Sequence, residues 1–205
     1  DNDSVTQMDL LVTNVFEQLD SNELVAVTNG DCSRVIEKLL RESSDYFVIM
    51  FADRLSGSYP DLFRHQFASH VCQTILYLGS AIVHKEINNI PISIPDSSLM
   101  SISSDVPKMS TIINEICEQL AGQWDLLAKN VYASHVLRTL IHILAGDYSM
   151  ADSDETRSKK SRVYNYNHRN LSNLAQNHQS NKAILDKYGK PLIEYDTPES
   201  FKVIL

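Results

Sequence analysis

The clearest pattern in the sequence is a helical spacing of hydrophobic residues that recurs in three copies of one segment. Residues 133–140 read Ala-Ser-His-Val-Leu-Arg-Thr-Leu, residues 68–75 are nearly the same, and residues 32–39 are a more distant copy. This spacing predicts three α-helices, each with one buried stripe, which we refer to as the signature helices. Aligned on their serines, the copies place hydrophobic residues at positions i, i+1, i+4 and i+5: Val35, Ile36, Leu39 and Leu40; Val71, Cys72, Ile75 and Leu76; and Val136, Leu137, Leu140 and Ile141.

Shorter segments with helical spacing accompany each signature helix and predict repeated three-helix units. The units occupy residues 23–58, 59–122 and 123–205, and residues 1–22 form a capping helix or a partial repeat. The chain is therefore predicted to be all-α, an α-solenoid of three-helix repeats that stack into a curved superhelix. Helical spacing is found at residues 4–19, 22–29, 31–42, 46–55, 61–65, 67–78, 112–120, 124–127 and 131–144.

Two polar segments without helical spacing interrupt this pattern. Residues 80–107 contain three prolines and many serines, and residues 147–196 are rich in Asn, His and Tyr. Both fall between the second and third helix of their unit, and we expect both to be mobile insertions. The basic run at residues 157–162 fits a solvated loop, a phosphate contact or a nuclear-import signal. Thr197 and Pro198 open a further helix as its N-cap and first residue.

The acidic charge of the chain is not evenly distributed. The 205 residues carry a formal net charge of −8, and residues 1–56 hold eleven Asp and Glu against four Lys and Arg. Net charge therefore gives no support to nucleic-acid binding, although it does not exclude a local binding surface. No run approaches the roughly 18 apolar residues of a membrane span. We expect the chain to be a piece of a longer protein, because it begins with Asp1 and ends within a hydrophobic segment.

Catalytic and metal-binding patterns are not found in the sequence. Cys32, Cys72 and Cys117 are widely spaced and have no paired His or Cys ligands, so we expect small core residues of a reduced compartment. His70 and His135 would suit catalysis or metal binding, but no clustered Asp, Cys or further His accompanies them. We therefore expect no enzyme activity, no metal and no other cofactor, and we predict that the two histidines stack on a ligand.

The polar face of each signature helix carries a serine, then Arg or His, then a hydrogen-bonding residue three positions later. One interpretation is a solvated helix face, as in any α-solenoid. The other is a binding surface, because Arg and His are flat enough to stack on a base and the third residue offers donors or acceptors on the same face. We favour binding because the pattern occurs three times. The candidate residues are Ser33, Arg34 and Glu37; Ser69, His70 and Gln73; and Ser134, His135 and Arg138.

These three-helix units and their signature resemble the pumilio (PUF) repeat family. The resemblance implies single-stranded RNA binding, with the serine and the third triplet residue at the edge of one base and the second residue stacked between bases. It also implies a guanine reader in the first unit (Ser with Glu), an adenine reader in the second (Ser with Gln) and a cytosine reader in the third (Ser with Arg). The units together would prefer 5′-C-A-G-3′, read from the third unit to the first.

A narrower resemblance is to the nucleolar protein nine family of divergent pumilio proteins, carried by residues 28–37, 68–74, 133–139 and 197–202. It implies contact with precursor or small-subunit ribosomal RNA during ribosome assembly, with pre-ribosomal proteins as further partners, in the nucleolus of the nucleus. No membrane and no small-molecule substrate are expected. The alternative function is a protein-binding α-solenoid without an RNA role, whose acidic N-terminal units receive a basic partner.

Overall fold

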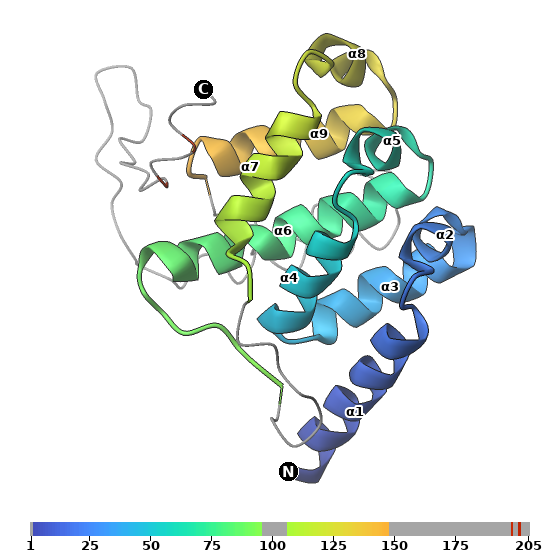
Figure 1. Cartoon of the computed structure of the whole chain (residues 1–205), viewed down its shortest axis with the longest axis vertical. Helices are drawn as coiled ribbons and strands as arrows, with labels where there is room; N and C mark the ends of the chain where they lie inside the picture. The colour runs from blue at the N-terminus through green and yellow to red at the C-terminus, as the bar shows by residue number, and fades with distance from the viewer. Residues whose placement is uncertain (1, 96–105, 148–197, 199–200, 202–205) are drawn as a thin grey trace, which may run out of the picture. The chain divides into compact units, whose positions relative to one another are not determined.

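The computed structural model describes residues 2–95, with side chains from Leu10 onward, residues 106–147, Pro198 and Phe201. These residues belong to one compact unit. They form nine helices and no strand, which confirms the all-α prediction for this part of the chain (Figure 1). The helices are α1 (Asn2–Gln18), α2 (Glu23–Thr28), α3 (Gly30–Glu42), α4 (Asp45–Arg54), α5 (Tyr59–Arg64), α6 (Ala68–Ile87), α7 (Met109–Gln119), α8 (Trp124–Lys129) and α9 (Ala133–Leu144).

The three signature helices are α3, α6 and α9, and they lie side by side with α6 in the middle (Figure 1). The helices α4 and α7 pack on α6 and on each other, so they form a second layer over the signature helices. Each of the short helices α2 and α5 contacts the signature helix of its own unit and that of the next unit. Neighbouring units are therefore joined by both short and signature helices.

Each signature helix begins with the same capping arrangement. Asn29 accepts hydrogen bonds through Oδ1 from the backbone N–H groups of Asp31 and Cys32 at 3.0 and 3.1 Å. Asn130 makes the same pair of bonds at the start of α9, at 2.9 and 3.0 Å. His65 makes it at the start of α6 through Nδ1, at 3.2 and 3.3 Å. These side chains satisfy backbone donors that a helix start otherwise leaves unpaired.

The predicted hydrophobic stripe is buried throughout α6 but not throughout the outer two signature helices. Val35 of α3 is 56% exposed and Ile141 of α9 is 45% exposed, so the prediction is wrong at both positions. Cys32 of α3 is also exposed, although we expected a core residue there. The reason is geometric: within the described residues α3 and α9 each have a signature-helix neighbour on one side only. Leu40 and Leu76, which are equivalent to Ile141, are both 0% exposed.

The helix α6 is longer than the sequence pattern predicted. We expected it to end at Leu78 and a mobile insertion to begin at residue 80, but the helix continues to Ile87. Ile82 and Val83 are buried, so their packing against the core extends the helix. The insertion in the second unit therefore begins after Ile87, and its residues 96–105 lie outside the described part of the chain.

The stretch after α6 is held in place rather than free. Ser93 donates its backbone N–H to Asp45 Oδ2 at 2.7 Å and accepts the backbone N–H of Asp45 at 2.8 Å. Lys85 Nζ lies 2.6 Å from the same Oδ2. Glu86 accepts the backbone N–H groups of Met109 and Ser110 at the start of α7, at 2.5 and 3.1 Å. The first part of the insertion is thus bonded to Asp45 at the start of α4, and the start of α7 after the insertion is bonded to Glu86 at the end of α6. The expectation of a poorly ordered segment is wrong for residues 80–87, which are helical.

The ends of the described chain add two findings. The helix α1 begins at Asn2, two residues before the expected start at Ser4. The insertion at residues 148–196 and the expected N-cap Thr197 lie outside the described residues. Phe201, however, is fully buried in the core, and its backbone N–H donates to the carbonyl of Pro198 at 2.9 Å. Phe201, the first hydrophobic residue predicted after Pro198, therefore packs against the same core as the repeats.

Equivalent positions in different units should respond differently to truncation. We predict that Leu40→Ala lowers the free energy of unfolding by about 2–5 kcal/mol, as is usual for a buried leucine. Ile141→Ala, at the equivalent but exposed position, should cost much less. Urea denaturation of the two variants measures the difference. Similar losses in both variants would contradict the burial described for α3 and α9.

Candidate functional site

The second and third triplet residues form a row across α3, α6 and α9. Arg34, His70 and Arg138 are exposed, and Glu37, Gln73 and His135 are half-buried. The signature helices that carry them are neighbours in space, although the residues are up to about a hundred positions apart in the sequence. The predicted surface residues of the three units are therefore brought together as one row.

The serines of the triplets do not belong to this exposed row. Ser33 is 2% exposed and Ser69 is 0% exposed, and Ser134 is half-buried. Ser33 Oγ donates to the carbonyl of Gly30 at 3.2 Å, and Ser134 Oγ to that of Val131 at 3.5 Å. The hydroxyl groups of Ser33 and Ser69 are therefore not part of the exposed surface in this structure, and their contact with a base stays a prediction. Ser69 Oγ is buried without a hydrogen-bond partner among the described residues. A small residue recurs here because it lies in the packed first turn of the helix, and in Ser33 and Ser134 the hydroxyl also bonds locally to the backbone.

His70 and His135 stack on each other. Their ring centroids are 5.2 Å apart and the ring planes differ by 29°. We expected each ring to stand between two bases, but a base placed between two rings needs about 7 Å, since atoms in contact are about 3.5 Å apart. The gap between these two rings is therefore closed in this structure. His70 keeps an exposed surface, whereas Nε2 of His135 is buried and has no hydrogen-bond partner among the residues that the structure describes.

Burial and the neighbouring ring together keep His135 neutral. Burial lowers the pKa of His135 below its ordinary value of 6.5, His70 and Arg138 lower it further, and a hydrogen bond to the backbone of Val131 opposes them. Because the unfolded chain then binds a proton more readily than the folded chain, this residue's contribution to stability falls as the pH drops below about 6.5. At neutral pH the ring is an uncharged stacking surface.

Glu37 is the acidic member of the row. Burial raises the pKa of Glu37 above its ordinary value of 4.5, and the positive charges of His70, Arg41 and Arg34 partly offset this. Glu37 of α3 and His70 of α6, on two helices in contact, therefore interact electrostatically. The carboxylate is an acceptor when ionised and gains a donor when protonated, so it matches a ligand edge that carries N–H groups.

Gln73 is held by a residue of the next unit. Its Nε2 donates to Oγ1 of Thr139 at 3.3 Å, and Oγ1 of Thr139 donates to the carbonyl of His135 at 3.2 Å. Thr139 lies outside the predicted triplets, and the sequence analysis missed it. The available signal was that threonine follows the third triplet residue in two copies, as Thr74 and Thr139. Both candidate side chains of the second unit, His70 and Gln73, are therefore in contact with α9.

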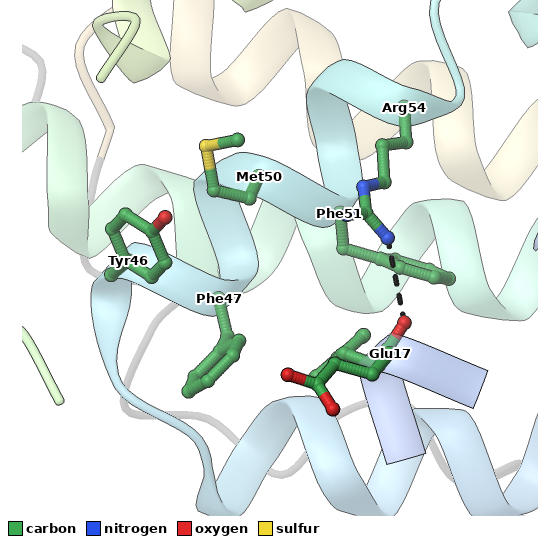
Figure 2. Close-up of a pocket in the computed structure, with 7 residues that line it drawn as sticks. Glu17, Tyr46, Phe47, Met50, Phe51 and Arg54 are labelled. Atoms are coloured by element: carbon green, nitrogen blue, oxygen red, sulfur yellow. Dashed lines mark hydrogen bonds between the residues drawn. The ribbon is translucent and has the colours of Figure 1, made fainter. Parts of the chain in front are cut away.

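A hollow lies between α1 and α4 (Figure 2). Phe16 and Phe47 stack there with ring centroids 5.2 Å apart. The guanidinium of Arg54 lies 3.1 Å from Oε1 of Glu23 in α2 and 3.4 Å from Oδ1 of Asp20 in the turn after α1. With its cation used structurally, this hollow offers aromatic packing and no pair of groups suited to acid–base chemistry. It is lined by Phe16, Glu17, Tyr46, Phe47, Met50, Phe51 and Arg54.

The described residues offer neither a metal-binding cluster nor a membrane-spanning helix. No three His, Cys, Asp or Glu side chains in this part of the chain are grouped so that they could hold a metal ion. No helix formed by these residues has the length and apolar character needed to cross a membrane. The row on α3, α6 and α9, which combines stacking and hydrogen-bonding side chains, is therefore the candidate site.

Comparisons with known proteins relate the chain to one family. Residues 21–205 match the family described as NOP9-like PUF repeat domain. Nucleolar protein 9 of Clavispora lusitaniae is 29% identical over 201 residues, which cover 93% of this chain and 26% of that protein. The Candida glabrata protein of the same name is 30% identical over 197 residues, covering 93% and 27%. That of Yarrowia lipolytica is 33% identical over 158 residues, covering 74% and 21%. The chain spans about a quarter of these relatives' length.

The histidine stack makes a prediction about proton binding. His70→Ala removes both the covering ring and its charge, so the pKa of His135 should rise toward 6.5. Titration of the imidazole signals by NMR measures this directly. Lys129→Ala, an exposed change on α8, should leave the His135 titration unaltered. A pKa of His135 at or above 6.5 in the unmodified chain would contradict the stacked, half-buried arrangement.

Proposed function

Because this chain belongs to the NOP9-like PUF repeat family, we propose that it binds single-stranded RNA through the exposed faces of α3, α6 and α9. The observation that supports this is the continuous row of flat and hydrogen-bonding side chains across three neighbouring helices. In this proposal Glu37, Gln73 and Arg138 contact base edges. Arg34 and the exposed surface of His70 provide stacking platforms.

The charge of this row differs from that of the chain. Of its six members, Arg34 and Arg138 are cationic and Glu37 is the single acidic residue, whereas the whole chain carries a net charge of −8. Burial raises the pKa of Glu37, which makes this carboxyl group less acidic. A negatively charged strand would therefore be repelled less here than over the rest of the surface, and the guanidinium groups can donate to phosphate or base acceptors.

The cellular role is proposed from the relatives. The curated relatives carry the name nucleolar protein 9. We propose that this chain likewise acts in the nucleolus, as part of a ribosome-assembly factor that contacts precursor or small-subunit ribosomal RNA and pre-ribosomal proteins. A binding role, rather than catalysis, follows from the chemistry of the row.

Removal of the stacking side chains tests the RNA interface. We predict that His70→Ala and Arg34→Ala each weaken binding of labelled single-stranded RNA by about 1–3 kcal/mol, the usual range for a base-stacking platform. Fluorescence anisotropy gives the affinities. Lys129→Ala is the matched control, because it removes an exposed cation from α8. If the control weakens binding as much as the other two variants, binding is non-specific. If the unmodified chain binds no RNA, the protein-binding alternative gains support.

Base identity tests the assignment of Glu37. An ionised carboxylate accepts from guanine N1–H and N2–H₂, whereas a glutamine amide both donates and accepts and so suits adenine. We predict that Glu37→Gln moves the preference at the 3′ base of 5′-C-A-G-3′ from guanine toward adenine. Anisotropy with RNAs that differ only at this base measures the change. Equal weakening for all four bases would refute base reading by this unit.

A further inference from the structure

We propose that Thr139 of the third unit positions Gln73 of the second, so that the third unit sets the base that the second unit selects. This inference rests on the proposed RNA-binding function and concerns one of its side chains. It makes Thr139 a positioning residue, because its hydroxyl acts through Gln73 and not on the ligand.

The hydroxyl of Thr139 is buried and already committed as a donor. Thr139 is 1% exposed, and its Oγ1 lies 3.2 Å from the carbonyl oxygen of His135, one turn earlier in α9. A carbonyl oxygen can only accept, so the proton of the hydroxyl points to His135. The lone pairs of Oγ1 remain, and toward any other group this oxygen is an acceptor.

Gln73 must then turn its nitrogen toward Thr139. The Nε2···Oγ1 distance is 3.3 Å. If the amide were reversed, Oε1 would face an oxygen that has no proton to offer, and a half-buried acceptor would be left unpaired. The bond to Thr139 therefore favours one of the two amide orientations. Oε1 then points away from Thr139. The second N–H of the amide lies beside Oε1, so these two groups can pair with a ligand.

One amide orientation distinguishes adenine from guanine. Adenine presents a donor at N6 and an acceptor at N1, whereas guanine presents an acceptor at O6 and a donor at N1, in the opposite order. A freely rotating glutamine could reverse its amide to suit either base. When Thr139 fixes the Gln73 amide, a base stacked on His70 faces one fixed order of amide donor and acceptor. The junction of the two units thus supplies the selectivity.

Thr74 provides a control within the same chain for the bond between Gln73 and Thr139. Thr74 occupies the position in α6 that Thr139 occupies in α9, and it is also buried. Its Oγ1 has no hydrogen-bond partner within the described structure. Replacing Thr74 by valine removes a hydroxyl from an equivalent place without breaking a bond to a base-reading side chain.

The experiment compares two RNAs, uridine-flanked 5′-C-A-G-3′ and 5′-C-G-G-3′, on the whole 205-residue chain by fluorescence anisotropy. A well-placed bidentate contact should give the unmodified chain a preference for the adenine RNA of about tenfold. Thr139→Val should reduce this ratio to about twofold or less, since the amide can then reverse. Thr139→Ser, which keeps the hydroxyl, and Thr74→Val should both retain the preference.

A second readout does not depend on RNA. The Gln73 side-chain N–H bonded to Thr139 should exchange with water more slowly in the unmodified chain and in Thr139→Ser than in Thr139→Val, as followed by NMR. If the unmodified chain binds neither RNA, the proposed function fails and amide exchange alone decides the positioning. Three RNA-binding results would overturn the inference: an unchanged ratio in Thr139→Val, an equal loss in Thr139→Ser or Thr74→Val, or binding without adenine preference. Equal exchange rates in the unmodified chain, Thr139→Ser and Thr139→Val would overturn it as well.

Discussion

The burial of α6 on nearly every side is the constraint on which the rest of the structure depends. This helix contacts α2, α3, α4, α5, α7 and α9, and twelve of its twenty residues are buried. Close packing of this kind requires small residues where neighbours approach. A Cβ added at Gly79 would lie 2.4 Å from Cε of Met109, so the side chain of Met109 occupies the space that glycine leaves. The helices on either side of α6 are placed by the same packing.

This packing makes the surface of the second unit a product of its neighbours. His70 has the ring of His135 against it, and Gln73 is bonded to Thr139, both from α9. On the other side, His70 affects the pKa of Glu37 on α3. A repeat array can therefore vary its chemistry in two ways, by changing a surface residue or by changing the residue of the next unit that holds it. The second way cannot be recognised from the sequence of a single unit.

The buried serines show that recurrence in a repeat has two possible causes. A residue recurs because it binds a ligand or because each unit needs it to fold. The positions of Ser33 and Ser69 at the packed start of their helices support the second cause, and the repeated caps from Asn29, His65 and Asn130 are another example. The surface chemistry rests instead on the residues beside these serines, which vary between the units while the folding residues stay similar.

The sequence alone determined the helical class, the three signature helices, the helix content of the units and the family resemblance. The helical features follow from local periodicity and capping, which act within a few residues, whereas the resemblance is carried by the signature motifs themselves. It could not determine which equivalent positions are buried, because Val35 and Ile141 have the pattern of core residues and lack a neighbour to cover them. The length of α6, the closed histidine stack and the Gln73–Thr139 bond were likewise decided by tertiary structure. Each depends on distances between side chains on different helices, and a spacing along one chain carries no information about those distances.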